Sequence, residues 1–235
     1  MSRYPHVAGP DPTSDPLLAA LFAQLDARLH GAICCKLVYG SCLRGGDIYD
    51  GLLDLYLICD NYRAAYRRPL LAASNWLLPP NVFYAEQKPL NGGDKSKTLR
   101  SKVTVISLRD FQRGCSSSWF ESYIWGRFAQ PTRILCARNE QIRSEIETAL
   151  MRAAHTLLQR ALPALPPEGS VLDLWVQALS LSYATELRTE RPGRAQELAS
   201  SSQNFYAALT RQHASSFGFS FTLTGQDEAL HYSSE

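Results

Sequence analysis

The sequence predicts an α+β protein with two domains, a mixed α/β domain at residues 15–138 and a mostly helical domain at residues 139–235. Two observations lead to this prediction. Up to about residue 138, short runs rich in β-branched and aromatic residues alternate with helical patterns, and after it long helical patterns dominate. The chain has 235 residues and is 45% hydrophobic, which is enough to bury a sizeable core.

Composition and charge narrow the function classes. The net charge of +2 is too small to indicate nucleic acid, and we expect no such partner. Six cysteines occur without a CxxC pair, so we expect reduced thiols of a cytoplasmic protein. The first residues are polar and rich in proline, unlike a signal peptide, and no run of about 18 apolar residues predicts a membrane span.

The first domain is predicted to begin with a helix followed by two strands. Asp15 and Pro16 provide an N-cap and a proline at the first helical position, and leucines at helical spacing follow. Residues 37–39 favour a strand that ends at Gly40 and Ser41. A second β-rich run, residues 55–59, is preceded by Asp54 and ended by Asp60.

The rest of this domain alternates in the same way. Asn61 can cap a helix over residues 62–68, and Pro69 either interrupts that helix or begins another over residues 70–78. In the later β-rich run, Lys102 shares a strand face with Thr104. The remaining predicted segments are strands at 81–85, 101–108 and 133–136, loops at 88–97 and 110–118, and a short helix at 119–128.

Three helices and a hairpin are predicted for the second domain. The helices cover residues 140–162, residues 193–213 and a stretch from the capping residue Ser170 to about residue 187, with a linker at 163–169. Near the C-terminus, phenylalanines alternate with polar residues over 217–223 before a turn at Gly225. This pattern is typical of a β-hairpin.

The Gly40–Ser41 turn and Asp54 form the candidate site. Backbone amides of a glycine turn can bind an anion, and a carboxylate at the start of the next strand can hold magnesium carrying a triphosphate. Nucleotidyltransferases of the polymerase-β type are built in this way. Their second acid stands two residues after the first, where this chain has Tyr56. The alternative interpretation is a plain β-hairpin with a buried aspartate.

Six short motifs together resemble one family, the mitochondrial-type phosphatidate cytidylyltransferases, also called translocator assembly and maintenance proteins, with their bacterial members. The motifs are YGSC (39–42), LLDLYLICD (52–60), PPNVFY (79–84), KVTVIS (102–107), YIWGRFAQP (123–131) and LSLSYATELR (179–188). Their order and approximate spacing also match those of the family. The family has an apolar residue where Tyr56 stands, and Cys42 replaces the last glycine of its Tyr-Gly-Ser-Gly turn.

The resemblance implies a polymerase-β-type nucleotidyltransferase domain followed by a mostly helical, winged-helix-like domain. It implies transfer of CMP from CTP to phosphatidic acid with Mg²⁺, giving CDP-diacylglycerol and pyrophosphate. A lipid acceptor implies peripheral association with the inner face of the membrane. Asp54 is expected to be a catalytic residue and the metal ligand, and Lys102 to be catalytic. The residues expected to bind nucleotide or phosphate are Tyr39, Gly40, Ser41, Tyr56, Arg127, Tyr183 and Arg188.

Several alternatives remain open at this level. The protein could transfer a nucleotide to a soluble acceptor, or could be a catalytically inactive nucleotide-binding module. Glu86 is the nearest candidate for a second metal-binding carboxylate, whereas Asp60 suits a helix cap or a contact with the nucleotide edge. Trp119 and Phe120 are candidates for contact with a membrane, and the alternative is that they pack the short helix against the sheet.

Overall fold

The computed structural model describes residues 4, 5, 7, 12–44, 47–89, 97–119, 121–184, 193–217, 221–225 and 229–234. The chain divides into two compact units. The sheet unit comprises Val7–Gln112 and Thr132–Ile146, and the helical unit comprises Met1–His6, Arg113–Pro131 and Glu147–Glu235. The domain boundary predicted near residue 138 stays a prediction.

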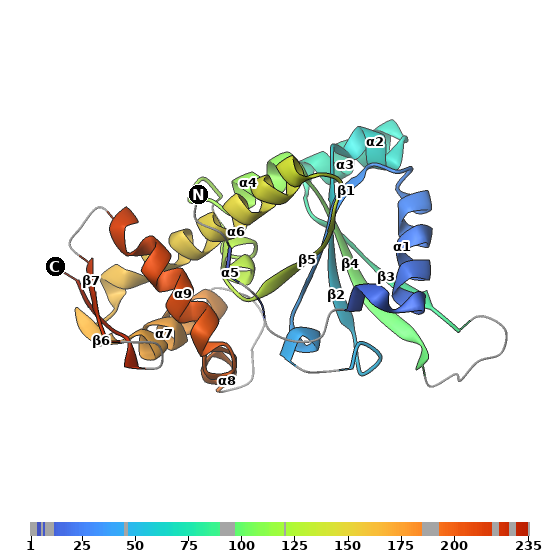
Figure 1. Ribbon diagram of the computed structural model, residues 1–235. Coiled ribbons are helices and arrows are strands. Elements are labelled where there is room, and N and C mark those ends of the chain that lie inside the picture. Colours follow the sequence, from blue (N-terminus) through green and yellow to red (C-terminus); the bar gives the residue numbers. More distant parts are fainter. Residues whose placement is uncertain are drawn as a thin grey trace. The chain divides into compact units, whose positions relative to one another are not determined.

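A mixed five-stranded sheet forms the core of the sheet unit (Figure 1), so the protein is a mixed α/β protein. The strand order is β3-β4-β2-β1-β5. β2 and β4 run parallel, and the other neighbouring strands are antiparallel. The strands are β1 (Ile33–Tyr39), β2 (Leu53–Cys59), β3 (Asn81–Gln87), β4 (Leu99–Ser107) and β5 (Thr132–Ala137).

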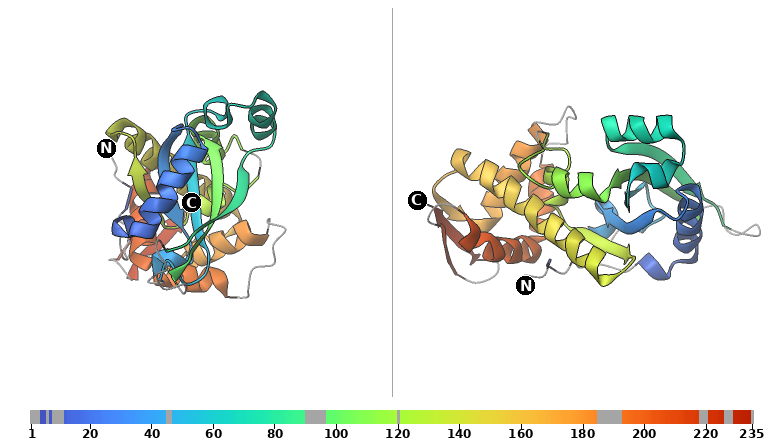
Figure 2. Two further views of the ribbon diagram at one scale, coloured as in Figure 1. Left: turned by 90° about the vertical axis from the view of Figure 1, so that its right-hand side faces the viewer. Right: turned by 90° about the horizontal axis from the view of Figure 1, so that it is seen from above.

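Helix α1 (Pro16–Arg28) covers one face of this sheet, and it lies in front of the strands in the left view of Figure 2. The predicted cap is confirmed, because Asp15 Oδ1 accepts hydrogen bonds from the amides of Leu17 and Leu18 at 2.9 and 3.1 Å. Four of the leucines at helical spacing are buried, namely Leu18, Leu21, Leu25 and Leu29. Asp26 of α1 also pairs with Lys36 of β1 at 2.9 Å, which joins the helix to this face.

Two short helices, α2 (Tyr62–Tyr66) and α3 (Pro69–Leu77), follow β2. The side chain of Asn61 caps α2 by accepting from the amide of Ala64 at 2.8 Å. Arg67 then adopts a left-handed conformation with φ of 53°, which ends α2. Pro69 therefore begins a new helix instead of interrupting a longer one, because its fixed φ suits the first helical position.

Two predicted segments around residue 114 are wrong in extent. Residues 110–118 were expected to form a loop, yet α4 covers Leu108–Gly114. Its start is capped by a serine: Ser107 Oγ accepts from the amide of Asp110 at 3.1 Å and donates to Asp110 Oδ2 at 2.9 Å. The helix predicted at 119–128 is confined to α5 (Trp125–Phe128), and turns take the place of its first part.

The helical unit adds a second, three-stranded sheet to its helices. The predicted hairpin near the C-terminus is confirmed in β7 (Phe221–Thr224) and β8 (His231–Ser234), and β6 (Glu168–Ser170) joins it from the segment predicted as a linker. The helix predicted at 193–213 breaks at Ser202, which follows two further serines of low helix propensity. The helices are α6 (Glu140–Ala161), whose first turns belong to the sheet unit, α7 (Val171–Ala184), α8 (Arg194–Ser201) and α9 (Gln203–His213).

A serine caps the start of α7 in the same way. Ser170 Oγ accepts from the amide of Asp173 at 3.0 Å and donates to its carboxylate at 2.6 Å, which confirms Ser170 as the predicted cap. Within the ranges that the structure describes, no helix has the length and apolar character needed to cross a membrane.

Candidate functional site

The predicted turn after β1 requires a glycine at its first position. Gly40 has a φ of +94°, a conformation that residues with a side chain rarely adopt. A Cβ placed on Gly40 would lie 3.2 Å from Asp54 Oδ2. The carboxylate of Asp54 therefore lies against the bare backbone of the turn, as the sequence predicted. Ser41 follows as an exposed residue at the start of a 3₁₀ turn, Ser41–Arg44.

Cys42 is accommodated inside this turn. Its Sγ atom donates to the carbonyl oxygen of Tyr39 at 3.6 Å, and the amide of Leu43 bonds the carbonyl of Gly40 at 3.3 Å. The cysteine thus closes the turn on the strand that precedes it. The backbone that is expected to bind phosphate keeps its glycine at position 40, where the conformation requires one.

Strand register places the two predicted catalytic side chains next to each other. Asp54 on β2 pairs with Tyr39 on β1 and with Lys102 on β4. Neighbouring strands lie about 4.8 Å apart, and residues paired in register project from the same face. Asp54 and Lys102 are both half-buried. The structure therefore places Tyr39, Asp54 and Lys102 in one row that begins beside Gly40, and we name it the catalytic row after the role predicted for it.

Tyr39, a member of this row, contacts both Asp54 and a second tyrosine, Tyr56. The hydroxyl of Tyr39 donates to Asp54 Oδ1 at 3.5 Å, the long limit of a hydrogen bond. Tyr56, two residues along β2 from Asp54, is fully buried, and its ring meets that of Tyr39 edge-on with centroids 5.7 Å apart. Tyr56 thus reaches the row through Tyr39, and its predicted contact with a nucleotide stays a prediction.

The other carboxylates considered from the sequence lie elsewhere. Glu86 is on β3, which β4 separates from β2, so its backbone is at least about 10 Å from that of Asp54. Hydrogen bonds from Tyr84 and from Lys88 engage Glu86 and lower its pKa. Asp60, at the far end of β2, pairs with Arg138 through two bonds of 2.9 and 2.8 Å.

The row nevertheless fits one mode of magnesium binding. In the described part of the chain, no three His, Cys, Asp or Glu side chains are grouped so that they could hold a metal ion among themselves. Magnesium in nucleotide sites is commonly held by one or two carboxylates together with substrate phosphates. Asp54 supplies one such carboxylate. It lies so close to the turn that a Cβ on Gly40 would crowd Asp54 Oδ2.

The remaining predicted site residues belong to the helical unit. The guanidinium of Arg127 lies 4.4 Å from the ring centroid of Tyr123. Tyr183 is half-buried on α7. The preceding residue, Ser182, lies close to α5, because a Cβ placed on Gly126 of α5 would be 3.2 Å from the Cβ of Ser182. Arg127 and Tyr183 thus come from adjoining helices of one unit. Their predicted nucleotide contacts stay predictions, and Arg188 lies outside the described residues.

The predicted membrane contact also falls in the helical unit. Trp119 is half-buried, and the guanidinium of Arg113 lies 5.0 Å from its ring centroid. Phe120 lies outside the described residues. A stacked arginine and partial burial are compatible with packing as well as with contact to a surface, so this stays a prediction.

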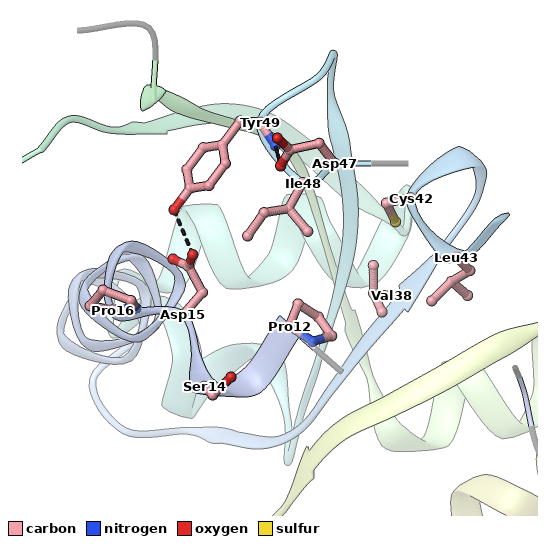
Figure 3. A pocket seen from close by; sticks show the side chains of 10 residues that line it. All are labelled: Pro12, Ser14, Asp15, Pro16, Val38, Cys42, Leu43, Asp47, Ile48 and Tyr49. Atoms are coloured by element: carbon pink, nitrogen blue, oxygen red, sulfur yellow. Dashed lines mark hydrogen bonds between the residues drawn. The ribbon is translucent and has the colours of Figure 1, made fainter. Parts of the chain in front are cut away.

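One pocket was not foreseen from the sequence. It has a volume of about 410 Å³ and lies at the start of α1 (Figure 3). In it the hydroxyl of Tyr49 donates to Asp15 Oδ2 at 2.5 Å, and burial together with this bond raises the pKa of Tyr49 to about 12. Val38 lines the pocket, and side chains alternate along a strand, so the pocket is on the sheet face opposite Tyr39 and the catalytic row.

The sequence contains only part of the signal for this pocket. Asp15 is recognisable as a helix cap, but its second oxygen is bound by a tyrosine 34 positions away. A contact over that separation depends on how the chain folds back, which local patterns do not encode.

A scan against protein-family models and a search of curated proteins both returned no match for this chain.

Proposed function

We propose that the protein is a magnesium-dependent nucleotidyltransferase that transfers CMP from CTP to phosphatidic acid, giving CDP-diacylglycerol and pyrophosphate. The observation that supports this proposal best is the position of Asp54. Its carboxylate lies against the glycine turn and in register with Lys102. A turn for phosphates, a carboxylate for their metal and a cation for their charge are what nucleotidyl transfer requires.

The proposal divides the work among a few residues. Backbone amides of the turn and the Ser41 hydroxyl bind the terminal phosphates of the nucleotide. Asp54 holds Mg²⁺, which when bound neutralises charge on the triphosphate. Lys102 supplies a further positive charge on the same sheet face. We assign the sheet unit to a polymerase-β-type domain and the helices with the sheet β6-β8-β7 to a winged-helix-like domain.

The reaction itself needs little acid–base chemistry. An oxygen of the acceptor phosphate attacks the α-phosphorus of CTP, and the bond to the bridging oxygen between the α- and β-phosphorus breaks. Pyrophosphate leaves with the electron pair of that bond. A phosphate monoester is largely ionised near neutral pH, so the attacking oxygen needs no proton removed. Alignment and charge neutralisation by the catalytic row are therefore the main requirements.

One observation favours a second candidate, a nucleotide-binding module without catalytic activity. The row contains a single carboxylate, because Tyr56 stands two residues after Asp54 and Glu86 is two strands away. A site with one acidic ligand depends on the substrate for the remaining metal ligands. Such a site could bind a nucleotide with its metal and still lack turnover.

Pyrophosphate release separates these candidates. The protein is incubated with Mg²⁺ and each of the four ribonucleoside triphosphates, with phosphatidic acid, with a soluble acceptor or with no acceptor. The proposal predicts release that needs phosphatidic acid and is fastest with CTP, because groups bonded to the cytosine edge are left unpaired by other bases. Release with a soluble acceptor only would indicate another transferase. Thermal stabilisation by CTP without any release would support the inactive module.

A further inference from the structure

Helix α3 buries a polar side chain and exposes its large apolar ones, which is opposite to the pattern of a helix packed on a core. Its buried residue is a polar one, Asn75, whose amide nitrogen donates to the carbonyl of Leu71 at 2.7 Å. Its large apolar side chains, in contrast, point to solvent. The exposed fractions are 86% for Leu70, 70% for Trp76, 69% for Leu77 and 76% for Leu78, the residue that caps the helix. Grouped exposed apolar side chains of this size mark sites of contact with a protein or a membrane.

The exposed apolar side chains continue from α3 toward the catalytic row. After Leu78 the chain enters β3, the edge strand, where Val82 and Tyr84 are 43% and 54% exposed. Tyr84 pairs in register with Lys102. Val82 and Tyr84 alternate with Phe83 and so share the sheet face of the catalytic row. We define the α3–β3 surface as Leu70, Trp76, Leu77, Leu78, Val82 and Tyr84.

Contacts with α2 and β3 attach this surface to the rest of the sheet unit. Helix α2 packs against α3. The side-chain amide of Asn81, the first residue of β3, donates to the hydroxyl of Tyr66 on α2 at 2.8 Å. The α3–β3 surface therefore belongs to the same compact unit as Asp54, and α3 lies at the end of the sheet where β2 ends (Figure 1).

The charge around α3 indicates what covers it. Between residues 61 and 85 the sequence contains three arginines and no acidic residue or lysine. All three are exposed: Arg63 lies on α2, and Arg67 and Arg68 directly precede α3. Glu86, which accepts from Tyr84 at the other end of the surface, is itself paired with Lys88. Tryptophan and leucine beside arginine is the composition that suits the boundary between the headgroups and the acyl chains of an anionic bilayer.

We propose that the α3–β3 surface docks the protein on anionic membranes, with the leucines and Trp76 in the headgroup boundary and the arginines on lipid phosphates. The choice of a bilayer over a protein partner rests on the proposed function, in which the acceptor phosphate is carried by a lipid. Val82 and Tyr84 then give a lipid apolar contacts on the way to Lys102. This surface differs from the one that Trp119 predicts.

Flotation of the full chain with vesicles tests the proposal. One set of vesicles is phosphatidylcholine alone and the other contains phosphatidic acid as well. We expect preference for the second set and a loss of at least about tenfold in the variant Leu70→Ser/Trp76→Ser/Leu77→Ser. Arg67→Glu/Arg68→Glu should lose roughly fivefold per arginine, and only on anionic vesicles. Trp119→Ala should bind as the wild type does.

The side chains changed on α3 are largely exposed, so thermal unfolding of the variants should match that of the wild type. Unchanged vesicle binding in the triple variant overturns the proposal, and so does loss of binding in Trp119→Ala alone. A wild-type dimer that the triple variant dissociates in sedimentation equilibrium also overturns it, because the surface then joins two copies of this chain.

The failure of the proposed function would look different. Turnover of short-chain phosphatidic acid, which is soluble, should be equal in the wild type and in the triple variant. If neither protein turns over any phosphatidic acid while vesicle binding still depends on α3, the docking surface stands and the enzymatic proposal fails.

Discussion

The two ends of β2 carry aspartates with contrasting surroundings. Asp60, after the strand, is bound by both terminal nitrogens of Arg138, and the backbone amide of Asp60 bonds the carbonyl of Ala32. Asp54, near the start, lies against a glycine turn and beside Lys102 in register. The first arrangement joins β2 to β1 and β5. The second places the Asp54 carboxylate beside the backbone of Gly40 and the positive charge of Lys102, a set of groups that suits a phosphate ligand with its metal ion.

The difference suggests a test of which acid of this strand is structural and which is functional. Both oxygens of Asp60 are bound by Arg138, whereas Asp54 adjoins the glycine turn that we propose binds phosphate. If this comparison is right, changes near Asp54 reduce activity more than stability, and changes at Asp60 do the reverse.

The largest effect is expected for Asp54→Asn. An amide cannot replace a carboxylate on a divalent ion, so turnover should fall by at least about 1,000-fold. Thermal unfolding should stay close to that of the wild type, because the amide is nearly isosteric. Initial rates of pyrophosphate release, measured alongside a melting curve, check both parts. Near-normal turnover would remove Asp54 from the catalytic machinery.

Lys102→Met should have the next largest effect. Loss of a preorganised positive charge at the reacting phosphates is expected to lower kcat about 100-fold, with little change in fold. Arg100→Met is the matched control, because Arg100 is exposed two residues earlier on the same strand face. Equal losses in the two variants would mean that general surface charge, and not the row, explains the effect.

A pair of glycines sharpens the comparison further. Gly40 and Gly51 have φ values of +94° and +97°, but a Cβ would meet Asp54 only at Gly40 and nothing within 4 Å at Gly51. Alanine at either position should cost about 1–2 kcal/mol of stability through backbone strain. Only Gly40→Ala should also lower kcat, by roughly 10- to 100-fold, because it displaces Asp54. Steady-state kinetics and denaturant titration distinguish the two effects.

The smallest effect is expected for Asp60→Asn. Asp60 and Arg138 are about two-fifths exposed, so solvent screens the pair and its loss should cost about 1 kcal/mol or less. Turnover should not change. The check is a denaturant titration with the kinetic assay run in parallel, and a large fall in kcat here would erase the distinction between the two ends of β2.

Local signals in the sequence predicted much of the sheet unit. The caps at Asp15 and Asn61, the glycine turn and the β-rich runs each act within a few residues, and the structure shows each of them. The same kind of signal was missed for α4, where the Ser107 side chain caps the helix through the amide of Asp110, three residues on. A Ser-x-x-Asp pattern after a strand would have predicted this helix.

The candidate site was harder to predict, because it depends on register. The sequence suggested Asp54 and Lys102 separately, but only the parallel pairing of β2 with β4 places them side by side. The exposure of the apolar side chains of α3 was also hard to predict, because it too depends on tertiary structure. Leucines at helical positions predict a buried face, and whether that face meets a core or remains at the surface is decided by tertiary packing.

Nucleotidyl transfer itself can be followed most directly by the fate of the α-phosphate. The protein is given CTP labelled at either the α- or the γ-phosphate, together with Mg²⁺ and phosphatidic acid, and the lipid is extracted. We predict that label from the α-position enters the lipid fraction and that label from the γ-position is released as pyrophosphate. With the Asp54→Asn variant, we expect no label in the lipid and no labelled pyrophosphate. Absence of α-label from every acceptor tested, with CTP bound to the folded protein, would contradict the account.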